Sequence, residues 1–179
     1  KSLTIEGVNG KNGEVWLDVL DGGFTSSNKG TTLTISTKVP VTIKNFKITG
    51  GYQGGGNGGG VKIAGDASLT MESGEISGNI GSDSGQASAG GVYMSHGGTS
   101  NFGATQIAGA IFTMNGGIIC NNTGNGVTMY DGSNPGTFTM TGGTISGNSG
   151  YGVDMVYSTG PFGKFIMKGE AVVTADNKV

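Results

Sequence analysis

The sequence of 179 residues contains no arginine, one cysteine and one histidine. Arginine supplies the planar fork that grips phosphates and carboxylates, so its absence removes the most effective phosphate ligand. With a net charge of only -2, the chain also lacks the basic surface that nucleic acid requires, and nucleic acid is excluded as an expected partner. A lone Cys120 cannot form an intramolecular disulfide. A lone His96 cannot build a multi-histidine metal site, so we expect no metal and no cofactor.

Long apolar runs are missing as well. None approaches the roughly 18 residues needed to cross a bilayer, so no transmembrane segment is predicted. Charged residues make up 12% of the chain. Disorder normally combines low hydrophobicity with high net charge, and the second condition fails here. The chain begins at Lys1 without a signal peptide; we interpret it as an excised or processed segment of a longer repeat protein.

Glycine is abundant, at 39 residues, and much of it belongs to a repeat. Residues 71–79 (MESGEISGN), 114–122 (MNGGIICNN) and 140–148 (MTGGTISGN) match position by position. The shared positions are a methionine, a glycine, an isoleucine and an asparagine: Met71, Met114 and Met140; Gly74, Gly117 and Gly143; Ile76, Ile119 and Ile145; Asn79, Asn122 and Asn148. Cys120 falls in the column of Ser77 and Ser146, which indicates a small strand residue without redox chemistry.

Two further elements recur with each copy. One reads G-V-x-M or G-V-K-I, at 60–63, 91–94, 126–129 and 152–155. The other leads into the next copy, at 41–43, 69–71, 112–114, 138–140 and 165–167. The base period is 26–28 residues with one longer insertion. Self-similarity of this length indicates a solenoid.

Each element is short and alternates apolar with polar residues, as half-buried strands do. Three such strands per 26–28 residues predict an all-β fold, a right-handed single-stranded parallel β-helix of about six coils. In the coil from Gly136 to Met155, five side chains should point inward: Phe138, Met140, Ile145, Val153 and Met155. The asparagine column should form a ladder at a turn.

Residues 1–30 fit the repeat less well and are interpreted as an N-terminal capping or first-coil segment, with Trp16 and Phe24 as capping residues. Residues 31–179 then form one continuous repeat domain. Solenoid ends present unpaired strand edges, so end-to-end self-association is expected.

The pairing of I-S-G-N, at 76–79 and 145–148, with a following G-G-V at 90–92 or G-V at 152–153 resembles the repeats of polymorphic outer-membrane proteins. Those repeats carry F-x-x-N and G-G-A-I motifs in right-handed β-helical surface passengers and adhesins. More broadly, residues 33–175 are similar to pectin-lyase-like β-helices of bacterial surface and secreted proteins. The resemblance implies an extracellular or bacterial cell-surface location.

The longest and most variable loops flank the G-V-x-M strand, and such loops build the walls of binding grooves. We therefore place the candidate ligand site over the outward column of that strand. Its residues and their neighbours supply aromatic faces, hydroxyls and charges suited to sugars: Lys62, Tyr93, Thr128, Tyr130, Asp131, Asp154 and Tyr157. The alternative is an ordinary solvated outer surface.

Catalytic residues are not assigned. Glycoside hydrolysis needs two carboxyl groups about 5–9.5 Å apart, and Asp154 with Asp131 is the one candidate pair. The polygalacturonase-like hydrolases that this fold resembles use a cluster of aspartates on adjacent coils, and the sequence shows no such cluster. The pectate-lyase-like enzymes usually use an Arg or Lys base with calcium carboxylates; arginine is absent here, and Lys62 is the only basic residue in the column. We expect a non-enzymatic, adhesin-like module that contacts polysaccharide or a host surface glycoprotein. The alternative is a carbohydrate-active enzyme or carbohydrate-binding module that uses the same groove.

Overall fold

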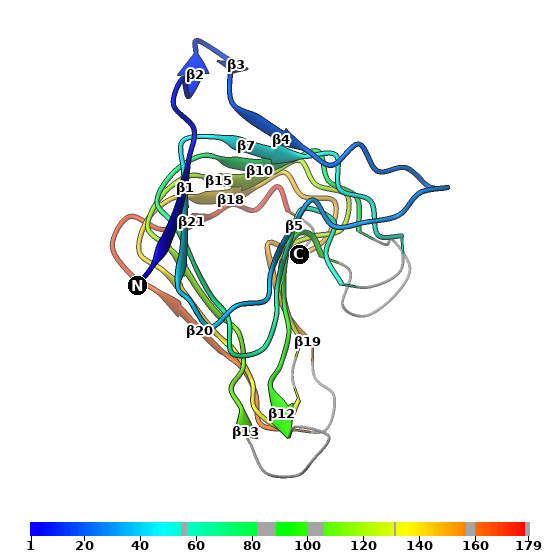
Figure 1. Ribbon diagram of the computed structural model, residues 1–179, viewed down its shortest axis with the longest axis vertical. Coiled ribbons are helices and arrows are strands. Elements are labelled where there is room, and N and C mark those ends of the chain that lie inside the picture. The colour runs from blue at the N-terminus through cyan, green and yellow to red at the C-terminus, as the bar shows by residue number, and fades with distance from the viewer. Residues whose placement is uncertain (55–56, 82–88, 100–105, 131, 157–159, 178–179) are drawn as a thin grey trace.

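The computed structural model describes residues 1–54, 57–81, 89–99, 106–130, 132–156 and 160–177, and it is built from strands that wind around one core (Figure 1). Three parallel sheets enclose this core. Sheet 1 contains β1 (Leu3–Glu6), β6 (Val41–Lys44), β9 (Ser68–Met71), β14 (Ile111–Met114), β17 (Thr137–Met140) and β20 (Lys164–Met167). Sheet 2 contains β4 (Val19–Asp21), β7 (Lys47–Thr49), β10 (Glu75–Ser77), β15 (Ile118–Cys120), β18 (Thr144–Ser146) and β21 (Val172–Val173). Sheet 3 contains β5 (Leu33–Ile35), β8 (Val61–Ile63), β11 (Ala89–Met94), β16 (Asn125–Tyr130) and β19 (Val153–Val156).

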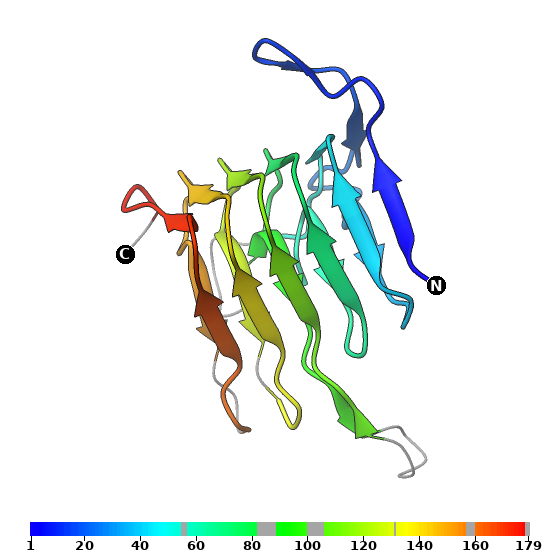
Figure 2. The same ribbon diagram turned by 90° about the vertical axis from the view of Figure 1, so that its left-hand side faces the viewer.

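The first five coils each contribute one strand to every sheet in turn, and the last described coil contributes β20 and β21; this confirms the predicted parallel β-helix of about six coils. Figure 2 shows the strands of sheet 1 side by side along the stack. Two small antiparallel pairs lie outside the sheets: β2 (Lys11–Asn12) with β3 (Val15–Trp16), and β12 (Gly98–Thr99) with β13 (Gln106–Ile107).

The core consists of ladders of like residues, because each coil repeats the apolar alternation of the one before it. Met71, Met114 and Met140 lie opposite one another in sheet 1 and are fully buried. In the same sheet the rings of Phe112 and Phe138 stack with centroids 4.8 Å apart, and the ring of Phe165 follows at 5.0 Å. Near-parallel stacking of identical side chains lets successive coils pack closely in the core.

Glycine makes the corner between sheets 1 and 2. Gly74, Gly117 and Gly143 have φ angles of 104°, 86° and 82°, a region that residues with a Cβ rarely adopt. Space is also short, since a Cβ on Gly74 would lie 2.4 Å from the backbone carbonyl oxygen of Phe46. These two constraints explain why the repeat keeps a glycine at this position.

A buried asparagine ladder makes the corner between sheets 2 and 3, as predicted. The amide oxygen of Asn122 accepts hydrogen bonds from the backbone N (3.1 Å) and Nδ2 (3.0 Å) of Asn79. Asn148 accepts the same pair from Asn122. The ladder continues at both ends, because Asn79 accepts from the Gly51 amide and Asn148 donates to Asn177. The asparagine of each coil therefore forms hydrogen bonds with polar groups at the turn of the neighbouring coil.

Connections differ sharply between the three corners. Most turns from sheet 1 to sheet 2 are tight, as at 45–46, 72–74, 115–117 and 141–143. Long connections lead into sheet 3 at 22–32, 50–60 and 78–88, and out of it at 95–110. In Figure 1 the described parts of these connections project on either side of sheet 3.

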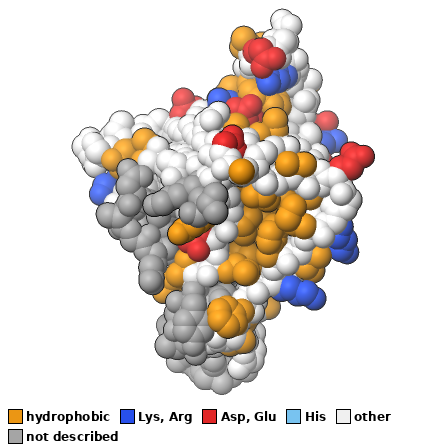
Figure 3. All heavy atoms as spheres, turned by 180° about the vertical axis from the view of Figure 1, so that it is seen from behind, with side chains coloured by type: hydrophobic (Ala, Val, Ile, Leu, Met, Phe, Trp, Pro, Cys, Tyr) orange, Lys and Arg blue, Asp and Glu red, His pale blue; other side chains and the backbone are white. Residues whose placement is uncertain are grey.

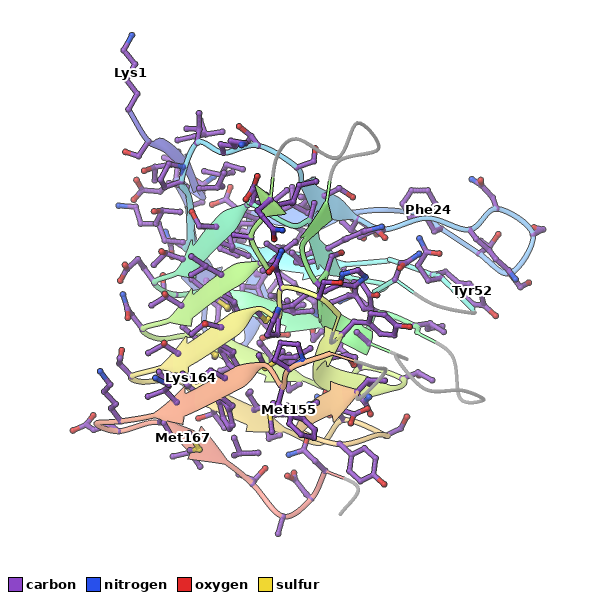
Figure 4. The ribbon with its side chains drawn as sticks, turned by 90° about the horizontal axis from the view of Figure 1, so that it is seen from below. Lys1, Phe24, Tyr52, Met155, Lys164 and Met167 are labelled. Carbon is purple, nitrogen blue, oxygen red and sulfur yellow. The ribbon has the colours of Figure 1, made fainter. Side chains whose placement is uncertain are left out.

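One packing expectation was wrong. Trp16 and Phe24 do not cap the end of the core: Trp16 lies against the outer side of sheet 2 and donates a hydrogen bond to Glu75, two coils further along. Phe24 packs within its own connection, against Gly30 (Figure 4). Met155 keeps the inward register, opposite Met129, but is 44% exposed because β19 is the last described strand of sheet 3. By contrast, Phe138, Met140 and Ile145 are fully buried, and Val153 packs against the core.

Candidate functional site

The outward column of sheet 3 is assembled as the repeat indicated. Lys62 lies opposite Tyr93, Tyr93 opposite Thr128, and Thr128 opposite Asp154. Val61 and Ile63, which flank Lys62 in β8, are fully buried in the core, so Lys62 faces the outside. The four residues come from four coils and span 92 positions of sequence, from Lys62 to Asp154. They form one line because the strands are parallel and in register.

The middle of this column is buried, although it faces outward. Tyr93 is 6% exposed and Thr128 is 0% exposed, whereas Lys62 and Asp154 are half-buried. Tyr93 forms a small outer apolar cluster with Ala89, Val156 and Tyr130. The connection before β8 also covers it, because a Cβ on Gly58 would lie 2.6 Å from Tyr93 Cβ. Tyr93 and Thr128 are therefore not ordinary solvated surface residues.

Asp154 is held by an amide that the sequence did not single out. Asn125 Nδ2 donates to Asp154 Oδ2 at 2.8 Å and to Thr128 Oγ1 at 3.1 Å, while Asn125 Oδ1 accepts from the Tyr151 backbone at 2.8 Å. Burial raises the pKa of Asp154, and the hydrogen bond from Asn125 opposes only part of that rise. Asn125 lies opposite Ala89 in the neighbouring strand. Because the equivalent residue is apolar there, the repeat did not indicate that Asn125 binds Asp154.

Aromatic rings gather beside the column. Tyr93 and Tyr130 have centroids 6.2 Å apart, and His96 lies 5.7 Å from Tyr130. Burial, helped by Tyr130, raises the pKa of Tyr93 to about 12, so its hydroxyl remains a neutral donor. His96 is exposed, and its Nδ1 contacts the carbonyl of Gly97. The rings of Tyr130 and His96 and the carboxyl of Asp154 are the accessible groups, and together they can stack on and hydrogen-bond a sugar.

Two of the predicted site residues, Asp131 and Tyr157, lie outside the described residues. Within the described part of the chain no group of three or more His, Cys, Asp or Glu side chains is placed to hold a metal ion. Nor does that part contain a helix long and apolar enough to cross a bilayer. Asp154 is then a carboxyl that can bind a hydroxyl or hold a proton, while hydrolysis would need a second carboxyl.

A hollow lies on the outer side of sheet 2, where no site was predicted. It has a volume of about 470 Å³ and is lined by Lys11, Glu14, Trp16, Val19, Lys47, Thr49 and Glu75. Glu75 joins the hairpin β2–β3 to the sheet: its Oε2 accepts from Trp16 Nε1 at 2.8 Å, and its Oε1 contacts Ser77 Oγ at 2.6 Å and Lys47 Nζ at 3.2 Å. Both oxygens are thus occupied, which makes this network a tether for the hairpin. The contact joins residues 59 positions apart, so no local pattern predicts it.

Comparison with known proteins adds the architecture and no activity. A family model described as a right-handed beta helix region matches residues 19–164. No curated protein and no solved structure matches the chain. The matched span contains the whole outward column of sheet 3.

Proposed function

Since this chain belongs to the family of right-handed β-helix regions, we propose that it is a non-enzymatic binding module of the extracellular or bacterial cell-surface type. Its stacked coils form a rigid scaffold, and its connections around sheet 3 contact a polysaccharide or a host surface glycoprotein. A solenoid suits this role, because its extended surface can present many loops at fixed spacing.

The unequal distribution of the connections carries the proposal. The corner between sheets 1 and 2 keeps turns of two or three residues in four successive coils, for example 45–46 and 141–143. Both corners of sheet 3 instead accept long connections, such as 50–60 and 95–110. Packing alone would favour short turns everywhere, since each added loop residue costs conformational entropy. Some coils keep short connections at these corners, such as 64–67 and 121–124, so the long connections are insertions in particular coils. Long loops that flank one sheet are typical of a binding surface.

The chemistry between these connections supports a carbohydrate. Lys62 and Asp154 place a cation and a carboxyl at opposite ends of the outward column, and Tyr130 and His96 add rings beside it. Rings that cover the apolar face of a sugar, with polar groups at the edge, are a common arrangement in ligand sites.

Binding to arrays of polysaccharides and immobilised surface glycoproteins tests the proposal. We expect Lys62→Ala and Asp154→Asn to weaken binding to the ligand found by at least about 5-fold, since each removes a charged hydrogen bond. Lys164→Ala, on the exposed outer side of sheet 1, is the matched control and should bind as the parent chain does. Full binding by both site variants would refute the assignment of the site.

The second candidate function is a carbohydrate-active enzyme. The observation in its favour is the pKa of Asp154, which burial raises in the direction that a general acid requires. Release of reducing or unsaturated sugar ends from a polysaccharide, abolished in Asp154→Asn, would replace the binding module with an enzyme.

A further inference from the structure

Asparagine followed by glycine occurs five times in the chain, and the structure places these pairs in different surroundings. The backbone nitrogen of the following residue can attack the side-chain amide of asparagine and close a cyclic imide. Glycine favours this step, because it has no Cβ to hinder the approach. The attack needs an amide and a backbone N–H that are both free, so hydrogen bonds decide which pair can react. The pairs are Asn9–Gly10, Asn12–Gly13, Asn57–Gly58, Asn115–Gly116 and Asn125–Gly126.

Two of the pairs lie within the coils of the β-helix, and both reacting groups of each are engaged. The two polar side-chain atoms of Asn115 are hydrogen-bonded to neighbouring side chains, and the Gly116 N–H donates to a carbonyl of the preceding coil. Asn125 makes three side-chain hydrogen bonds, and the Gly126 N–H donates to a carbonyl of the following coil. Several hydrogen bonds must therefore break before either ring can close.

Two further pairs lie in connections and are held in other ways. The carboxylate of Asp18 binds both groups of the first pair: Oδ1 is 3.0 Å from Asn9 Nδ2, and Oδ2 is 2.7 Å from the Gly10 nitrogen. Gly58 is buried and packs against β11. Ring closure at Asn57 would therefore require this connection to move away from the sheet.

The pair Asn12–Gly13 differs from the other four. It lies at the tip of the hairpin β2–β3, which projects at the top of the molecule in Figures 1 and 3. Both residues are exposed, and no described residue forms a hydrogen bond with the Asn12 side chain or with the Gly13 N–H. Gly13 has a φ of 57°, and a Cβ placed on it would meet no atom within 4 Å. Both reacting groups are free, and the ring has room to form.

We propose that Asn12 is a site of spontaneous deamidation, in which its side-chain amide is converted to a carboxylate. The Gly13 nitrogen forms a bond to Asn12 Cγ, and Asn12 Nδ2 leaves as ammonia together with the proton of the Gly13 N–H. Water then opens the cyclic imide at one of its two carbonyl groups. Opening at Cγ gives aspartate at position 12, whereas opening at the backbone carbonyl gives isoaspartate, whose backbone runs through the side chain. Solvent water is the only co-reactant, and nothing is oxidised or reduced.

The isoaspartate product lengthens the backbone of the hairpin at its tip. β2 and β3 pair through only two residues each, and Asn12 is one of them. The other pair, Lys11 with Trp16, carries the ring that holds the hairpin on sheet 2 through its hydrogen bond to Glu75. A longer backbone shifts Trp16 away from Glu75, so the modification is a slow, one-way release of the hairpin.

Peptide mapping by mass spectrometry, during incubation of the folded chain in mildly alkaline buffer, tests the proposal. Cleavage after lysine separates Asn9 from Asn12, because Lys11 lies between them. We expect Asn12 to convert at least about 10-fold faster than each of the other four asparagines, since hydrogen bonds or packing must yield first at those positions. In concentrated urea the five rates should come close together, because the unfolded chain leaves every pair free.

Asn12→Gln is the control variant, since the longer side chain keeps an amide at this exposed position but disfavours the ring. Trp16 is the only tryptophan of the chain, so its fluorescence reports on the hairpin directly. The signal should change as position 12 is converted in the parent chain and stay constant in Asn12→Gln. Neither measurement needs a ligand, so the result is independent of the proposed binding function. An unconverted Asn12, equal rates at all five pairs in the folded chain, or a Trp16 signal that does not follow the conversion would each overturn the proposal.

Discussion

Replacement of Asn122 by alanine tests whether the asparagine ladder is a main source of stability. The Asn122 side chain makes four hydrogen bonds: Oδ1 accepts two from Asn79, and Nδ2 donates to the Ile76 carbonyl and to Asn148 Oδ1, each at 3.0 Å. Asn122 is only 2% exposed, so water cannot take over these roles. At about 1 kcal/mol for each bond, the loss in the free energy of unfolding is about 4 kcal/mol.

A loss of this size is a large fraction of the total stability of a domain, about 5–15 kcal/mol. Urea unfolding followed by circular dichroism measures it. The matched control is Asn115→Ala in the same coil, since Asn115 bonds to Glu72 and Thr141 on the exposed side of sheet 1. We expect the control to lose about 0.5 kcal/mol or less. If Asn122→Ala loses no more than Asn115→Ala, the ladder does not stabilise the corner and the reasoning fails.

Three further predictions follow from the core and from two carboxyl groups. Phe138→Ala should lose about 3–5 kcal/mol, because Phe138 is fully buried between two stacked rings; a loss under about 1 kcal/mol in urea unfolding would show that the stack does not fill the core. For Glu75, burial would raise the pKa, but hydrogen bonds from Ser77, Trp16 and Lys47 outweigh it and the pKa is lowered. The hairpin contact is therefore fully present above the ordinary value of 4.5 and is lost as pH falls through the lowered pKa of Glu75, which Trp16 fluorescence should report; the same pH response in Glu75→Gln would exclude Glu75 as the cause. For Asp154 the sign is opposite: its raised pKa means that the ionised form destabilises the fold above that pKa and has no such effect below the ordinary value of 3.8. Asp154→Asn should thus be more stable than the parent at neutral pH and lose this advantage below pH 3.8; equal stability at both pH values would contradict the burial of the charge.

Repetition in the sequence made the ladders predictable. When a chain repeats with a constant period, equivalent residues stack, so the methionine, isoleucine and asparagine columns can be aligned without coordinates. The alignment of Lys62 with Tyr93, Thr128 and Asp154 follows from the same argument. The requirement for glycine at Gly74, with its φ of 104°, is visible as a constant glycine. Each of these features repeats from one coil to the next, and the sequence period alone shows which residues are equivalent.

Contacts between unlike segments were not predictable in this way. Trp16 reaches Glu75 across 59 residues, and Asn125 binds Asp154 across 29 residues, with no repeat to indicate either pair. The burial of Tyr93 depends on where the connection containing Gly58 comes to lie, which is set by packing in three dimensions. The alignment of the site residues in one column could therefore be predicted from the sequence, whereas the exposure of each residue could be read only from the structure.

The sequence by itself determined the period, the inward and outward sides of each strand and the glycine and asparagine corners, because one coil imposes its pattern on the next. Only the tertiary structure decided which outward residues are covered and which inward residues are exposed. Thr128 faces outward and is fully buried, while Met155 faces inward and is 44% exposed. Alternation specifies the direction of a side chain, whereas burial depends on whether another segment lies in that direction.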